Sequence, residues 1–132
     1  MILDTSAIVA ILRREPEADA CLRVLESAPE LRMSAGNLLE ALLVVDNSKI
    51  PALPGRLDEF LLDHAITIEP VTESQARLAR IAHQQYGRGN DSKAKLNYGD
   101  CFAYALARER GEPLLFVGED FTHTDIRPAL TT

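Results

Sequence analysis

The sequence opens with Met1-Ile2-Leu3-Asp4-Thr5-Ser6-Ala7, in which an apolar run passes directly into a carboxylate and two hydroxyls. The apolar run predicts a short buried strand, and the apolar spacing that follows predicts a helix with Thr5 or Ser6 as its N-cap. Asp4 would then lie at the carboxyl-terminal tip of a strand, on the edge where open α/β sheets bind their ligands. Taken alone, Asp4 is either a cation ligand or an ordinary capping residue.

Segments with strand and helix character alternate along the rest of the chain. Apolar or β-branched segments predict strands at residues 31–33, 65–71 and 114–117, with residues 125–128 as a candidate edge strand. Helical spacing is found at residues 15–28, 36–47, 57–64, 73–86 and 99–110, whereas residues 50–55 and 88–97 have the composition of loops. The alternation implies parallel βαβ units and an α/β fold, a three-layer α/β/α sandwich with a mainly parallel sheet. We expect one domain over residues 1–132.

Composition limits the classes of function. The 132 residues include 14 basic and 20 acidic ones, and the formal charge of −6 argues against general electrostatic binding of nucleic acid. It is compatible with an enzyme whose acids are concentrated at a metal site, or with a basic partner protein. No apolar segment is long enough to span a bilayer, and no secretory signal is recognisable. Cys21 and Cys101 lie in apolar helical patterns, as expected of buried thiols in a reducing compartment, so we expect a cytoplasmic protein.

Glu40 is the most informative acid in the chain. It interrupts residues 38–45, which are apolar on nearly every side and therefore predict a buried helix. A buried carboxylate without a partner is costly. Glu40 should therefore pair with an Arg or Lys, bind a proton or bind a metal, unless it lies on an exposed stripe of the helix.

Two further acids stand in comparable positions. Asp100 begins a very apolar helix after residues 97–99, so it either serves the helix dipole or faces a cleft. Asp120 follows an apolar strand, as Asp4 does, and is either a turn residue or a second strand-end acid. Carboxylates brought together repel one another, and a hard divalent cation such as Mg²⁺ or Mn²⁺ removes that penalty. Such a site suits phosphodiester hydrolysis by a metal-activated water.

Four segments together resemble a known family. Residues 3–7, Glu40 in its Leu-rich helix, residues 97–107 and residues 118–125 resemble the PIN-domain ribonucleases, and more narrowly the VapC toxins of type II toxin–antitoxin systems. The resemblance extends over the whole chain. It implies a Mg²⁺- or Mn²⁺-dependent endoribonuclease with a compact α/β/α fold, which forms a homodimer and is held inactive by a cognate antitoxin protein.

The resemblance also implies roles for particular residues. The first acid of the family falls on Asp4, its helical Glu on Glu40 and its third acid on Asp100. The strand-end hydroxyl falls on Ser6, which would hold a ligand or a water. We place the fourth acid on Asp120. Its neighbours Glu119 and Asp125 are the alternatives. The three Asp residues would coordinate the metal directly or through water, and the Glu would bind the same metal or orient the water.

A flexible basic segment leads into Asp100. It contains Arg88, Lys93 and Lys95 between glycines and small polar residues. This segment is either a solvated loop or a surface that steers the phosphates of single-stranded RNA toward the metal.

Two other classes of protein remain as alternatives. An acid-cluster phosphotransfer domain of the haloacid-dehalogenase type needs a second Asp two residues after the first, where this chain has Ser6. A catalytically inactive acidic module that only binds a basic partner has no need of Glu40 in its apolar helix. Both therefore fit the sequence less well than a nuclease.

Overall fold

The computed structural model describes residues 1–89 and 93–131. The strands are β1 (Ile2–Leu3), β2 (Arg32–Ser34), β3 (Thr67–Glu69) and β4 (Leu114–Leu115). The helices are α1 (Thr5–Leu12), α2 (Ala18–Ser27), α3 (Ala35–Asn47), α4 (Leu53–Asp63), α5 (Glu73–Tyr86) and α6 (Tyr98–Arg110). The four strands are parallel and form one sheet in the order β3-β2-β1-β4.

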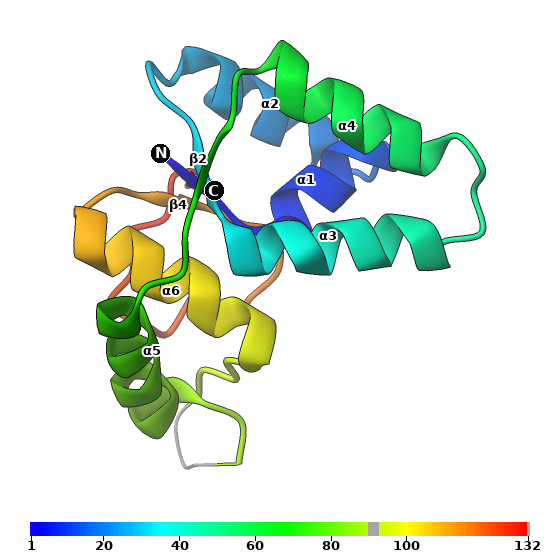
Figure 1. Ribbon diagram of the computed structural model, residues 1–132. Coiled ribbons are helices and arrows are strands. Elements are labelled where there is room, and N and C mark those ends of the chain that lie inside the picture. The colour runs from blue at the N-terminus through cyan, green and yellow to red at the C-terminus, as the bar shows by residue number, and fades with distance from the viewer. Residues whose placement is uncertain (90–92, 132) are drawn as a thin grey trace.

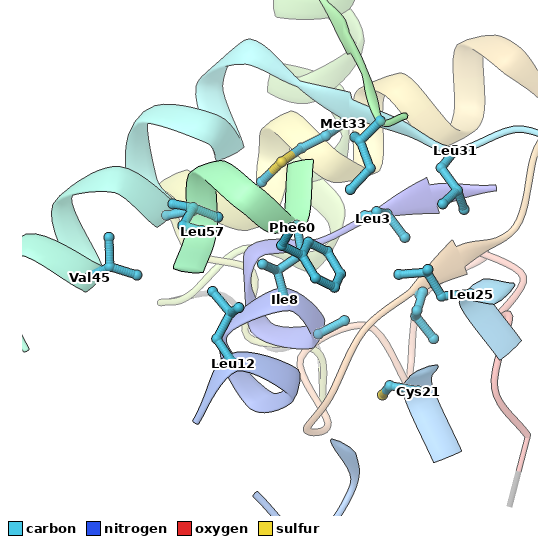
Figure 2. Packing of buried hydrophobic residues seen from close by; sticks show 14 of the residues in the cluster. Leu3, Ile8, Leu12, Cys21, Leu25, Leu31, Met33, Val45, Leu57 and Phe60 are labelled. Atoms are coloured by element: carbon cyan, nitrogen blue, oxygen red, sulfur yellow. The ribbon is translucent and has the colours of Figure 1, made fainter. Parts of the chain in front are cut away.

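Helices cover both faces of this sheet because successive strand residues point to opposite sides. Leu3 and Leu115 are fully buried in a core with residues of α1, α2, α3 and α4, and Figure 2 shows the packing of this core. Ile2 and Leu114 are fully buried in a second core, formed with α5, α6 and the C-terminal segment. Figure 1 shows α5 and α6 on one side of the strands and α1, α2 and α4 on the other. The predicted three-layer α/β/α sandwich is confirmed.

Several predicted boundaries were wrong. The N-cap of α1 is Asp4, not Thr5 or Ser6, because the chain is already helical at Thr5. Residues 53–55 are the first turn of α4, not loop, because Pro54 is tolerated in a first turn and Leu53 is buried in the core. The candidate edge strand at 125–128 forms a single bridge, between Pro128 and Leu114 of β4.

The carboxyl ends of three strands open toward the same place. Asp4 follows β1, α3 follows β2, and residues 116–120 follow β4. The Asp4 amide donates to the carbonyl oxygen of Leu115 at 2.9 Å, which ties the exits of the two central strands together. Parallel strands bring their carboxyl ends to one edge, so the topology gathers residues that are far apart in sequence.

The opposite edge of the sheet carries compensated charge. The Met1 amino group lies 2.6 Å from the Glu112 carboxylate, and Arg32 Nε lies 3.3 Å from the same side chain. Glu69, the last residue of β3, lies 3.9 Å from the Arg32 guanidinium. Glu112 at the amino edge of the sheet therefore has basic partners, and Arg32 also lies near Glu69 at the end of β3.

Over residues 1–89 and 93–131, the chain has no helix of the length and apolar character that crossing a membrane would need.

Helix α4 offers a test of the larger core. Leu57 is fully buried, whereas Leu62 in the same helix is 80% exposed. We expect Leu57→Ala to lower the free energy of unfolding by about 2–5 kcal/mol, because it removes a buried side chain and leaves a cavity. Leu62→Ala should change it by less than about 0.5 kcal/mol. Urea unfolding of both variants measures the difference, and equal losses would contradict the assignment of this core.

Candidate active site

Asp4 is fixed at the start of α1 through one of its two oxygens. Its Oδ2 accepts the amide of Ser6 at 3.0 Å and the hydroxyl of Ser6 at 2.6 Å. The Ser6 oxygen in turn accepts the amide of Val117 at 3.0 Å, so the same hydroxyl connects α1 to the exit of β4. The second oxygen of Asp4, Oδ1, is buried and has no hydrogen-bond partner in the described part of the chain. The fixed side chain therefore presents one free acceptor.

Asp100 is held in the same way at the start of α6. Its Oδ2 accepts the amide of Asn97 at 2.9 Å, and Asn97 Oδ1 accepts the amide of Asp100 at 2.9 Å. This reciprocal pair is a capping box, and it fixes the carboxylate on the helix while using one oxygen. Only 7% of the Asp100 surface is exposed, although Asp100 lies in a first turn. Asn97 was not identified from the sequence, although its spacing from Asp100 is that of a capping box.

Glu40 reaches the site from α3, but the reason given for its importance was partly wrong. Residues 38–45 are not buried on every side, because Leu39 and Leu43 are 58% and 51% exposed. Glu40 itself is half-buried, and its Oε1 accepts a hydrogen bond from Asn37 Nδ2 at 3.3 Å. Among the described residues it forms no ion pair with Lys, Arg or His, so the alternative of a buried ion pair is not supported.

Asp120 is the acid after β4 that faces the other carboxylates. Glu119 is exposed, and Asp125 is engaged elsewhere, accepting a hydrogen bond from the Tyr104 hydroxyl at 2.6 Å and lying 3.4 Å from Arg108. Asp120 instead lines a cavity of about 270 Å³ together with the other three acids. The residues around this cavity are Asp4, Thr5, Ser6, Val9, Glu40, Val44, Asn97, Asp100, Val117, Asp120 and Phe121.

Burial and mutual repulsion perturb two of these carboxylates. Burial raises the pKa of Asp4 to about 6, with further increases from the charges of Glu40 and Asp120, although the hydrogen bonds at its N-cap act in the opposite direction. Burial also raises the pKa of Asp100 to about 7, against the hydrogen bond from the Asn97 amide, and the charges of Asp4 and Asp120 and a side-chain hydrogen bond with Asp120 raise it further. The charges of Asp4, Glu40 and Asp120 thus contribute to these two shifts of pKa.

The donor set fits a hard divalent cation. The acidic groups around the cavity offer carboxylate oxygens, and one of these oxygens is a buried acceptor without a partner in the described chain. No ion pair within the described chain neutralises these four acids. As the side chains at described positions stand, no group of three or more His, Cys, Asp or Glu residues could hold a metal ion. This spacing is consistent with carboxylates that repel one another, which a cation would draw closer.

The predicted RNA-binding residues lie on the segment before α6. Arg88, Lys93 and Lys95 are all exposed, and Arg88 Nε donates to the carbonyl oxygen of Lys95 at 3.2 Å. A bridge between Gly87 and Leu96 closes the base of this segment, whose residues 90–92 are outside the described part of the chain. The three cations are thus carried close to the first turn of α6.

Comparison with known proteins identifies the family. A model of the PIN domain matches residues 1–127. The chain is 49% identical to Ribonuclease VapC28 of Mycobacterium tuberculosis over 130 residues, which are 98% of each protein. The chain belongs to the VapC ribonucleases of the PIN-domain family. It is therefore an enzyme of a metal-dependent nuclease family, as the resemblance implied.

Solved structures show the same fold in more distant VapC proteins. The crystal structure of Mycobacterium tuberculosis VapC20, a Sarcin-Ricin loop cleaving toxin, superposes with a TM-score of 0.74 at 18% identity and covers 96% of this chain and 98% of that one. VapBC2 from Rickettsia felis, solved with a DNA fragment from its promoter, gives a TM-score of 0.72 at 18% identity and covers 96% and 94%. The fold of this VapC-family chain is thus that of its relatives.

The raised pKa values predict how stability depends on pH without metal. The folded protein binds the protons of Asp4 and Asp100 more tightly than the unfolded chain, in which an Asp titrates near about 3.9. Their contribution to stability is therefore complete below about pH 4 and is lost as the pH rises through about 6 to 7. In a chelator at about pH 7.5, Asp100→Asn should raise the melting temperature, because it removes a charge while keeping an acceptor for the cap.

At about pH 4 the gain from Asp100→Asn should disappear, since the native carboxyl is then protonated. Asp46→Asn, at an exposed position of α3, is the control and should have no comparable effect at either pH. A gain of equal size at both pH values would show that charge at Asp100 is not its cause. Differential scanning calorimetry across this pH range measures all three proteins.

Proposed function

We propose that Asp4, Glu40, Asp100 and Asp120 form the catalytic metal site with which this VapC ribonuclease hydrolyses RNA, with Mg²⁺ or Mn²⁺ as the cation. The observation that carries the proposal is the gathering of four acids around one cavity with no basic side chain paired to them in the described chain. A cation supplies the missing positive charge. The charge of the cation would also favour the ionised forms of Asp4 and Asp100 at neutral pH, although burial raises the pKa of both.

Each acid has a role that follows from its surroundings. Asp4 and Asp100 are the firmest ligands, because each is fixed through one oxygen at the start of its helix. The second oxygen of Asp4 has no hydrogen-bond partner in the described chain, and the Asp100 carboxyl also forms a side-chain hydrogen bond with Asp120. Asp120 completes the ligand set from the segment after β4, and Glu40 binds the same metal or orients the attacking water. Ser6 acts by holding Asp4 and the β4 exit together. A bound metal would lower the pKa of the attacking water and stabilise charge on the leaving oxygen.

The substrate proposed for this site is single-stranded RNA. The family carries ribonuclease activity, and Arg88, Lys93 and Lys95 supply exposed positive charge on the segment that leads into α6. The relative VapC20 is a Sarcin-Ricin loop cleaving toxin, which supports RNA as the class of substrate. Because the net charge is −6, this local positive charge is the part of the surface suited to phosphate.

We further propose a cognate antitoxin as inhibitor and a homodimer as the assembled form. Solved relatives include toxin–antitoxin complexes from Klebsiella pneumoniae and Rickettsia felis. Exposed apolar side chains on the described surface support protein partners, with Leu39 and Leu43 on α3 and Tyr98, 80% exposed, at the start of α6. An apolar groove of about 460 Å³ lies between α5 and α6. Both cysteines are buried and unpaired, which suits action in the cytoplasm.

Cleavage of RNA in Mg²⁺, Mn²⁺ or EDTA tests the metal site. Asp4→Asn and Asp100→Asn should each lower the cleavage rate by at least about 100-fold, because each removes a metal-ligand charge. EDTA should abolish the wild-type activity, and added Mn²⁺ or Mg²⁺ should restore it. Asp63→Asn, at an exposed position on α4, is the matched control and should cleave like the wild type. Cleavage that persists in EDTA, or in both site variants, would refute the proposal.

The basic segment is tested through the salt dependence of RNA binding. Replacing Arg88, Lys93 and Lys95 by Ala should weaken binding and reduce the slope of log K against log salt, since phosphate contacts release counterions. The control replaces the same number of exposed arginines outside the site, Arg13, Arg23 and Arg56. Fluorescence anisotropy with labelled RNA measures both slopes, and equal slopes in the two triple variants would remove this segment from RNA binding.

A further inference from the structure

Glu40 lies on a half-exposed helix and needs something to hold its carboxylate in the site. We propose that Asn37 and Gly99 are positioning residues, one donating to the Glu40 carboxylate and the other making room for it against the first turn of α6. The inference rests on the proposed role of Glu40 in binding metal. It concerns two residues that do not line the acidic cavity.

Asn37 joins three helices at one point. Its side chain is completely buried in the first turn of α3, where Nδ2 donates to Glu40 Oε1 at 3.3 Å and to the carbonyl oxygen of Gly99 at 3.0 Å. Its own carbonyl oxygen accepts the hydroxyl of Thr5 at 3.0 Å. The first turns of α1, α3 and α6 are therefore connected through this residue, and each of these helices carries one of the proposed site acids or follows directly on one.

The amide of Asn37 is not explained by stability alone. Its Oδ1 is buried and has no hydrogen-bond partner in the described part of the chain, and a buried acceptor without a partner opposes folding. The opposite orientation of the amide would turn that oxygen toward the Glu40 carboxylate and the Gly99 carbonyl, both of which are acceptors. An apolar side chain of similar size would avoid the unpaired oxygen. What it could not supply is the pair of N–H donors.

Gly99 is explained by the same carboxylate. A Cβ at this position would contact Glu40 Oε2 and lie 2.8 Å from Glu40 Cδ, closer than unbonded carbon atoms approach. The residue is inside α6 and does not have a positive φ, so its backbone does not require glycine. Glycine is also among the least favourable residues for a helix. The absent side chain therefore leaves space that the Glu40 carboxylate occupies.

The two residues thus hold Glu40 from both sides. Asn37 binds one carboxylate oxygen, and the bare backbone at Gly99 admits the other against the turn that carries Asp100. The amino end of a helix also favours a negative charge at this position. Without these contacts the Glu40 side chain is free to rotate toward solvent on a helix whose Leu39 and Leu43 are already exposed.

Calorimetric titration of the purified protein with Mn²⁺ tests the positioning roles of Asn37 and Gly99 without measuring cleavage. Asn37→Leu and Gly99→Ala should each weaken Mn²⁺ binding by about 10- to 100-fold, the range found when groups that orient metal ligands are removed. The metal-free melting temperature should stay level or rise in both variants. Asn37→Leu removes an unpaired buried acceptor, and Gly99→Ala introduces a residue that favours the helix more than glycine does.

Matched controls are available in the same chain. Gly55 is exposed in the first turn of α4, and no atom lies within 4 Å of the place that a Cβ would occupy, so Gly55→Ala should leave Mn²⁺ affinity unchanged. Asn47 is exposed at the end of α3, so Asn47→Leu should also leave the affinity unchanged. In a Glu40→Ala background, Asn37→Leu and Gly99→Ala should cause no further loss of affinity, because the group that they position is gone.

Three outcomes separate the possible failures. If Asp4→Asn and Glu40→Ala keep the wild-type affinity for Mn²⁺, the proposed metal site is wrong and the positioning role falls with it. If those two weaken binding while Asn37→Leu and Gly99→Ala do not, only the positioning role is wrong. If the latter two weaken binding equally with and without Glu40, they act through another group and the inference is overturned.

Discussion

Repulsion between acids at the carboxyl edge of the sheet is the constraint on which the rest of this structure depends. At the amino edge, Glu112 is balanced by Arg32 and the Met1 amino group. At the carboxyl edge, four carboxylates line one cavity and form no such pairs in the described chain. The fold tolerates this arrangement because protons can neutralise two of the acids, and a divalent ion would do so at neutral pH.

At Asp4 and Asp100, helix capping would not compete with the proposed metal binding. From sequence, each could be read either as a helix-start residue or as a ligand. The structure shows that each serves its helix through Oδ2 alone. The hydrogen bonds that start the helix also fix the direction of the second oxygen, so local helix chemistry supplies the rigidity that a metal site needs.

Glu40 was singled out on a premise that the structure bears out only in part. The apolar composition of residues 38–45 predicted a helix buried all round, whereas Leu39 and Leu43 are exposed. Sequence periodicity assigns apolar residues of this kind to the core. It cannot distinguish a helix face buried inside the protein from an apolar face on its surface. The constraint on Glu40 comes instead from contacts across α3 and α6, which link Asn37, Glu40 and Gly99.

The sequence by itself determined the order of strands and helices, the parallel three-layer fold, the family and the acids proposed as ligands, because these follow from local periodicity and short motifs. It misplaced the N-cap of α1 by at least one residue, because Thr5 is already helical. It also placed the start of α4 too late, because Pro54 is tolerated in the first turn of that helix. Only the tertiary structure decided that Asp120 lines the cavity while Asp125 binds Tyr104, and that Asn37 reaches Gly99. These contacts join residues far apart in the chain, and packing alone sets their distances.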